Sequence, residues 1–87
     1  MSALYGRYHG RILRLARVSA ADGAWKPKLR EILAEFDDEC RHLSASSTSA
    51  LRYELACQIE QEALCFSDAE KRKVLVLALK HFDAGEQ

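Results

Sequence analysis

The stretch LREILAEFDDECRHL, residues 29–43, carries the clearest core-facing pattern in the chain. Its apolar residues recur mostly at steps of three or four, which places them along one side of an α-helix. They are Leu29, Ile32, Leu33, Phe36, Cys40 and Leu43. The acidic residues Glu31, Glu35 and Asp38 occupy the opposite side, where water can solvate them. Because Pro27 suits the first turn of a helix, we expect this helix to begin near that residue.

A second amphipathic helix is predicted upstream, over residues 3–19. One side of it carries Leu4, Tyr5, Tyr8, Ile12, Leu15, Ala16 and Ser19. Residues 20–24 are predicted as a turn, because the Asp22-Gly23 pair suits a backbone conformation with positive φ. A short turn should therefore join the first two helices.

Downstream, the serine-rich residues 44–49 are predicted as a turn whose hydroxyls can cap a third helix, over residues 50–65. This third helix has two apolar sides. The larger side holds Leu51, Leu55, Ile59, Ala63 and Phe66, and the smaller side holds Tyr53, Cys57 and Leu64. Two apolar sides on one helix imply two neighbours.

A last helix is predicted to begin at a capping box. In that arrangement the Ser67 oxygen accepts an N–H one turn into the helix, and Glu70 reaches back to the N–H of Ser67. The helix should run to about Phe82, and Gly85 is placed to close it. Residues 74–79 are apolar almost all round, so this helix should be central to the fold or covered by another subunit.

These four segments predict an all-α protein, a small up-and-down bundle of about four helices in a single domain over residues 1–87. Turns are expected near residues 20–26, 44–49 and 66–68. The longest apolar run is too short to cross a bilayer, and the N-terminal segment does not resemble a secretory signal. The three cysteines are an odd number, which fits reduced thiols, so we expect a cytoplasmic protein without membrane contact.

Charge is sorted along the chain although the formal net charge is zero. Residues 1–30 carry seven basic residues and one acidic residue, whereas residues 31–70 carry ten acidic and two basic residues. Two segments of opposite sign can neutralise each other inside one fold, or they can present opposite faces to different partners. The acidic side of the second helix carries Glu31, Glu35 and Asp38. It could accordingly form a solvated surface that keeps the bundle soluble, or bind a basic partner.

Four arginines form a basic stripe on the first helix, at Arg7, Arg11, Arg14 and Arg17. Such a stripe could contact the phosphates of a nucleic acid, with a tyrosine as a stacking surface. The same residues could instead be solvated, or pair with Glu31, Glu35, Asp37 or Asp38 of the neighbouring helix. The sequence pI near 6.8 and the absence of a recognition motif favour this second interpretation.

Catalytic and metal-binding chemistry find little support in the sequence. Cys40 and His42 would point in directions about 200° apart on a helix, so one ion could not take both. Glycine-rich phosphate loops are missing as well, and we expect no metal, no cofactor and no enzymatic activity. Glu62 is unusual because it lies within an apolar side, where a carboxylate needs a basic neighbour or a shifted pKa.

Two families share short patterns with this chain. The residues Ala21-Asp22-Gly23, followed by Pro27, Glu31 and Leu33, resemble the turn-and-helix element of TerB-like tellurite-resistance domains, with Leu29 where that family has an acidic residue. The segment from Lys71 to Phe82 is similar to the helix that leads to that family's second turn. The Ala-Asp-Gly sequence, with Leu29-Arg30, Leu33 and Glu39-Cys40-Arg41, also resembles the small helical co-chaperones of the type III secretion needle subunit. The first resemblance implies a role in stress resistance and the second a role in binding another protein.

Several apolar residues lie outside the main core-facing stripes. These are Leu13 and Val18 on the first helix, Tyr53, Cys57 and Leu64 on the third, and Val76 on the fourth. A monomer of this size has few places to bury them, and exposed apolar patches rimmed by charge are typical of binding sites. The sequence therefore predicts a non-enzymatic interaction protein, an adaptor, co-chaperone or small inhibitor, whose partner is another protein or a second copy. A nucleic-acid-binding accessory protein and a TerB-like stress-resistance domain are the alternatives.

Overall fold

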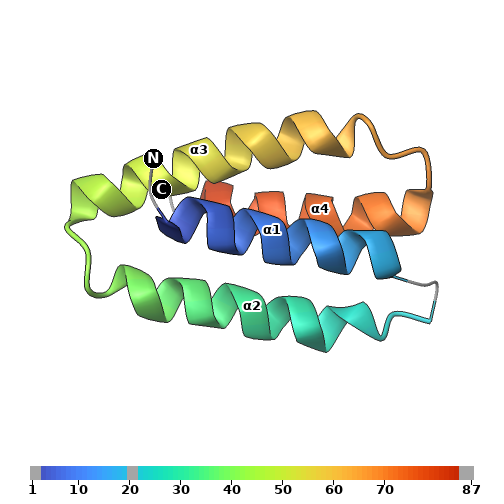
Figure 1. Ribbon diagram of the computed structural model, residues 1–87, viewed down its shortest axis with the longest axis horizontal. Helices are drawn as coiled ribbons and strands as arrows, with labels where there is room; N and C mark the ends of the chain where they lie inside the picture. Colours follow the sequence, from blue (N-terminus) through green and yellow to red (C-terminus); the bar gives the residue numbers. More distant parts are fainter. Residues whose placement is uncertain (1–2, 20–21, 85–87) are drawn as a thin grey trace.

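The computed structural model describes residues 3–19 and 22–84, which form four α-helices. These are α1 (Ala3–Val18), α2 (Trp25–Cys40), α3 (Ala45–Ala63) and α4 (Ala69–Ala84), and no strand is present within those residues. Successive helices run in opposite directions (Figure 1). The predicted all-α bundle is therefore confirmed.

The four helices are not packed equally. α1 lies in front of α4, and α2 and α3 form the two outer edges (Figure 1). α1 and α4 each pack against the three other helices, whereas α2 and α3 have almost no contact with each other. The same view shows that α1 begins at the end of the bundle where α4 ends.

The core is built around aromatic side chains from three helices. Tyr8 of α1 meets Phe36 of α2 edge to face, with ring centroids 5.3 Å apart, and Phe36 meets Phe82 of α4 in the same way at 5.0 Å. All three rings are buried. The stripe on α2 is buried as predicted, except that Leu43 lies beyond the helix and is half-buried. In the apolar run of α4, Val74, Leu75 and Ala78 are buried but Leu77 is exposed.

The turn between α1 and α2 has the predicted Asp-Gly geometry. Gly23 has a φ of 76°, a backbone angle that residues with a Cβ rarely adopt. Asp22 Oδ1 accepts the N–H of Ala24 at 3.0 Å, which fixes the turn just before the helix. α2 begins at Trp25, so Pro27 lies in its first turn, as expected.

Two helix starts differ from the prediction. α3 begins at Ala45, five residues early, because Ser44 Oγ accepts the N–H of Ser47 at 3.1 Å and caps the helix before the other serines. α4 is capped by Asp68 instead of Ser67, since Asp68 Oδ1 accepts the N–H groups of Glu70 and Lys71 at 2.9 and 3.1 Å. The predicted closing residue, Gly85, lies outside the described residues.

Candidate functional site

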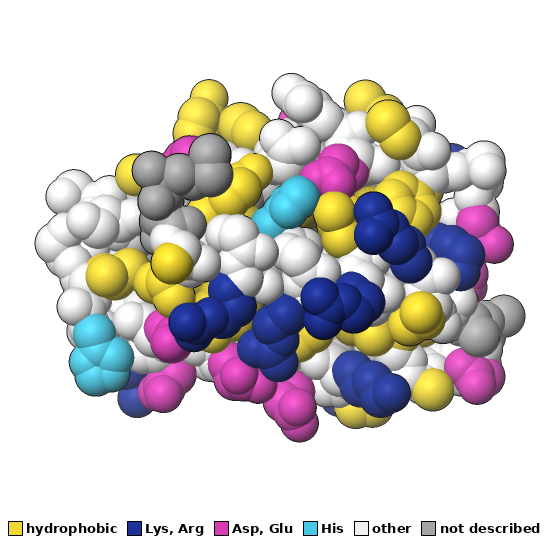
Figure 2. All heavy atoms as spheres, viewed as in Figure 1, with side chains coloured by type: hydrophobic (Ala, Val, Ile, Leu, Met, Phe, Trp, Pro, Cys, Tyr) yellow, Lys and Arg dark blue, Asp and Glu magenta, His cyan; other side chains and the backbone are white. Residues whose placement is uncertain are grey.

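Two strongly exposed apolar side chains that the sequence singled out lie on the outward side of α3. Tyr53 is 64% exposed and Leu64, just after the helix, is 83% exposed, while Cys57 between them is half-buried. We call these three residues the α3 ridge. Figure 2 shows hydrophobic side chains standing out along the edge that α3 forms. A hydrogen bond to Cys57 raises the pKa of the Tyr53 hydroxyl above its usual value.

Two other predicted binding residues do not belong to this surface. Leu13 is only 9% exposed, so its assignment as surplus surface was wrong. The reason is that α1 packs against three helices, which bury a wider arc than a single stripe. Val76 is half-buried in α4, whereas its neighbour Leu77, which the sequence analysis did not select, is exposed. Val18 is 72% exposed at the end of α1, as predicted.

The arginine stripe of α1 is half neutralised by α2. Arg11 makes a two-pronged hydrogen bond to Glu35, at 2.9 and 3.1 Å, and Arg7 pairs with Glu39 at 3.2 Å. Figure 2 shows basic side chains in a row across α1, with acidic side chains beside them over α2. The hydrogen bond from Arg11 holds the pKa of the Glu35 carboxyl below its usual value. Pairing with Glu35 was among the alternatives predicted, whereas Glu39 was missed.

The other two arginines of the stripe have different surroundings. Arg14 and Arg17 are exposed and form no ion pair with any described residue. Of the acidic residues expected to pair with the stripe, Asp38 pairs with Arg41 at 3.5 Å and Asp37 pairs with Arg52. The stripe is therefore two structural ion pairs followed by two free cations.

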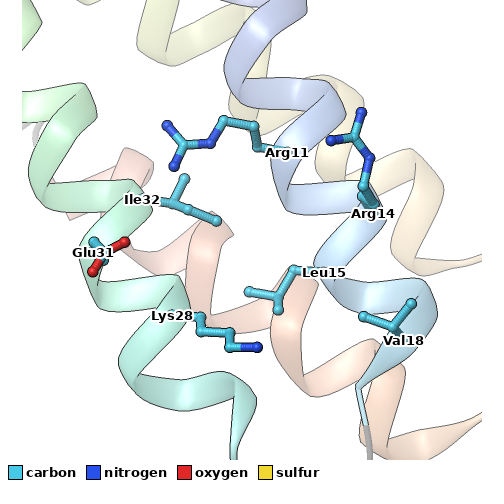
Figure 3. Close-up of a pocket in the computed structure, with 7 residues that line it drawn as sticks. All are labelled: Arg11, Arg14, Leu15, Val18, Lys28, Glu31 and Ile32. Carbon is cyan, nitrogen blue, oxygen red and sulfur yellow. The ribbon is translucent and has the colours of Figure 1, made fainter.

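A groove of about 340 Å³ follows the seam between α1 and α2 (Figure 3). Leu15 and Ile32 form its floor and Val18 lies at one end, while its rim carries charged side chains from both helices. These are Arg11, Arg14, Lys28 and Glu31. Because Arg11 is engaged by Glu35 and Glu31 is acidic, this rim has mixed charge.

A second groove, of about 440 Å³, lies between α2 and α4, and its charge has one sign. Its apolar lining consists of Trp25, Leu29, Leu33 and Leu77, and its polar lining consists of Lys26, Arg30, Lys80 and His81. We call it the basic groove, since none of the described residues that line it is acidic. Sequence reasoning missed this groove because α2 and α4 are far apart in the chain. The four-residue spacing of Lys26 and Arg30 was the one available signal.

Glu62 has a basic neighbour, His9, as its position within an apolar side predicted. Its Oε1 contacts His9 Nε2 from α1 and accepts a hydrogen bond from Gln58 at 3.3 Å. Tyr5 stacks on His9 with ring centroids 5.5 Å apart. Burial raises the pKa of Tyr5, and the charges of Glu62 and Glu54 raise it further. This cluster joins α1 to α3.

The cysteines stand in three different environments. Cys40 is buried, Cys57 is half-buried and Cys65 is exposed, and all three are free thiols. Burial raises the pKa of the Cys40 thiol, which keeps it protonated and unreactive. Within the described part of the chain, no three His, Cys, Asp or Glu side chains gather as a metal site would require.

Arg52 connects three helices through its guanidinium group. From α3 it donates to Asp37 of α2 at 2.9 Å and to the carbonyl oxygens of His81 and Phe82 in α4, at 3.0 and 3.5 Å. His81 Nε2 also contacts Asp37, at 3.0 Å. The Asp37 carboxylate is thus paired with Arg52 and with His81, a lining residue of the basic groove, while its own side chain is 42% exposed.

Comparison with protein-family models, curated proteins and solved structures gives no match. The resemblances to TerB-like domains and to needle-subunit co-chaperones therefore stay predictions. Across residues 3–19 and 22–84, no helix has both the length and the apolar character that crossing a membrane requires.

Proposed function

We propose that this protein is a non-enzymatic protein-interaction module, an adaptor, co-chaperone or small inhibitor, that binds a partner through the α3 ridge. One observation carries the proposal: Tyr53 and Leu64, two large side chains on a single helix face, are both mostly exposed. Isolated exposed apolar residues are ordinary, but an aligned aromatic and aliphatic pair is typical of the anchors of an interface. The free thiols fit a reducing compartment, so we propose that it works in the cytoplasm.

The surroundings of the ridge support this role. Cys57 lies between the two anchors along α3, and Glu54 and Glu60 on the same helix are exposed. An apolar centre with a charged rim is the usual anatomy of a protein-binding surface. The ridge also stands on a helix that Leu51, Leu55 and Ile59 hold in the core, so binding costs little ordering of the backbone.

A capture experiment with paired variants tests the proposal. The chain is immobilised, and proteins retained from its native lysate are compared between the parent and the Tyr53→Ser, Leu64→Ser double variant. The double variant should lose the retained partner. Val18→Ser is the matched control, because it also removes an exposed apolar side chain but lies on α1, away from the ridge. Equal retention by all three proteins contradicts the proposal.

A nucleic-acid-binding role for α1 is the second candidate, supported by the free cations Arg14 and Arg17. Because Glu39 and Glu35 neutralise Arg7 and Arg11, only about two arginines are available to phosphates. The binding constant for a DNA oligonucleotide can be measured by fluorescence anisotropy. A plot of its logarithm against the logarithm of the salt concentration should have a slope of about −2, and the Arg14→Ala, Arg17→Ala double variant should lose this salt dependence. No measurable binding at low salt rejects this candidate.

A further inference from the structure

The cations of the basic groove are not neutralised by the chain itself. Lys26, Arg30 and Lys80 are exposed and have no ion pair within the described residues. Two acidic residues contact residues that line the groove, but neither pairs with Lys26, Arg30 or Lys80. Asp37 pairs with Arg52 and His81, and Glu70 accepts a hydrogen bond from Trp25 Nε1 at 3.2 Å and pairs with Lys73. The groove therefore offers an apolar floor with uncompensated positive charge around it.

The α3 ridge has the opposite chemistry. Its apolar residues are flanked by Glu54 and Glu60, two exposed carboxylates that form no ion pair with the residues described. The ridge is a convex helix face with negative flanks, and the groove is a concave seam between two helices with positive flanks. Shape and charge are thus complementary.

One molecule cannot bring these two surfaces together. α3 forms one edge of the bundle, whereas the basic groove lies between α4 and α2, the helix at the opposite edge (Figure 1). Since α2 and α3 have almost no contact, the ridge can reach a basic groove only on another molecule. We propose that the α3 ridge of one molecule packs into the basic groove of a second copy of this chain. The inference rests on the proposed function and names the partner of the ridge.

The two surfaces are of comparable length. The ridge from Tyr53 to Leu64 spans about 16 Å along α3, and the α2 side of the groove from Trp25 to Leu33 spans about 12 Å. Leu64 or Tyr53 would contact Leu77, which is 40% exposed, and the glutamates would face Lys26, Arg30 and Lys80. A formal net charge of zero favours such association, because no overall repulsion opposes it.

The symmetry and strength of the contact follow from this geometry. Because ridge and groove are different surfaces, the contact is head-to-tail, and each molecule keeps one free ridge or groove for the next. Three helical turns bury less than the roughly 800 Å² per partner of a stable complex. Association should therefore be weak, with a Kd between about 10 µM and 1 mM, and it should weaken with added salt.

Sedimentation analysis over about 10 µM to 1 mM tests the proposal on the full chain in a reducing buffer, which prevents disulfides through Cys65. The weight-average mass should rise with concentration and pass that of a dimer. A mass that stays at one chain throughout overturns the inference.

Two variants each remove one surface. The ridge variant is Tyr53→Ser with Leu64→Ser, and the groove variant is Arg30→Glu with Lys80→Glu. Each alone should raise the Kd at least about tenfold. The matched control, Arg14→Glu with Lys28→Glu, changes the net charge equally but lies at the α1–α2 groove, and it should associate like the parent. All these positions except Tyr53 and Leu64 are exposed charges, and thermal unfolding verifies that every variant folds.

Mixing the two variants gives the decisive result. The groove variant has an intact ridge and the ridge variant has an intact groove, so an equimolar mixture should form one-to-one pairs that stop at the dimer. A mixture that stays monomeric while the parent associates overturns the head-to-tail contact. If the chain is monomeric yet the ridge variant loses a captured protein, this inference fails and the proposed function stands. If association persists in the ridge variant, the ridge does not mediate it and this inference fails.

Discussion

The reactivity of each cysteine follows from what surrounds its sulfur. Cys40 is buried at the end of α2, where desolvation raises the pKa of its thiol. The Thr48 hydroxyl donates a hydrogen bond to the Cys40 carbonyl oxygen in the same turn. Cys65 lies in the exposed connection between α3 and α4, and its Sγ contacts only the Gln61 carbonyl among the described groups. A thiol must be accessible to react, so these two residues are at opposite extremes of exposure.

We predict that a disulfide reagent such as DTNB modifies Cys65 first and Cys57 more slowly in the native protein. Cys40 should react at least about a hundredfold more slowly than Cys65, because it needs local or global unfolding. Mass spectrometry of the labelled peptides assigns each rate. In denaturant the three rates should converge, and a native Cys40 as fast as Cys65 would show that its site is open.

The ion pair between Arg11 and Glu35 predicts a pH dependence of stability. Because the Glu35 pKa is lowered from its usual 4.5 in the folded state, the pair stabilises the protein above about that pH. The contribution is lost as the pH falls through the lower, folded pKa. Denaturant unfolding of the parent and of Glu35→Gln should therefore differ slightly at neutral pH and converge in acid. A difference that grows toward low pH would have the wrong sign.

At the scale of single helices, caps decide where α3 and α4 begin. The serine run made residues 44–49 look like a turn, but a single hydroxyl, that of Ser44, satisfies the first N–H groups and leaves the other serines helical. At α4 an aspartate displaced the expected serine cap, and Glu70 was free to bind Trp25 of α2. The period of the apolar residues predicted that each helix exists. Its first residue depended on which of several neighbouring polar side chains accepts the first backbone N–H groups.

The cap at α4 gives a prediction at this scale. Asp68→Ala removes the acceptor for two backbone N–H groups and should lower the free energy of unfolding by about 1 kcal/mol. Ser67→Ala is the matched control and should change the free energy of unfolding by less than about 0.5 kcal/mol. Chemical denaturation measures both. Equal losses of stability in the two variants would contradict the assignment of Asp68 as the cap of α4.

The surfaces between helices were harder to predict than the helices. The α3 ridge could be predicted because its residues share one helix and a simple spacing. Leu13 was misplaced because the number of neighbours around α1 is a property of the packing. The basic groove combines side chains from α2 and α4, and its lining residues Leu29 and Leu33 look like ordinary core positions. Only the pairing of these two helices reveals it.

At the scale of the whole molecule, a few polar contacts connect the ends of helices to neighbouring helices. Arg52 binds both α2 and the last turn of α4, and Lys71 Nζ of α4 donates to the carbonyl oxygens of Arg17 and Ser19 at 2.8 and 3.2 Å. These contacts satisfy carbonyls at helix ends, which otherwise lack partners. The hydrogen bond from Arg52 to Asp37 also connects α3 to α2, although those helices hardly touch.

We predict that Arg52→Ala lowers the free energy of unfolding by about 2 kcal/mol, because it removes one donor from the Asp37 carboxylate and the side-chain donor of two helix-end carbonyls. Arg41→Ala is the control, since Arg41 also pairs with an aspartate but its side chain is 80% exposed, against 14% for Arg52. That change should be close to zero. Thermal or denaturant unfolding compares the two, and a control loss as large as that of Arg52 would contradict the assigned role.

The position of the first and last helices has a consequence for rearranging the chain. Because α1 begins where α4 ends, a short peptide could join them, and new ends could be opened at residues 41–44. This connection joins the two helices with the least mutual contact, so a circularly permuted chain would keep nearly all of its packing. Such a permutant would separate the influence of chain order on folding speed from the influence of packing on stability.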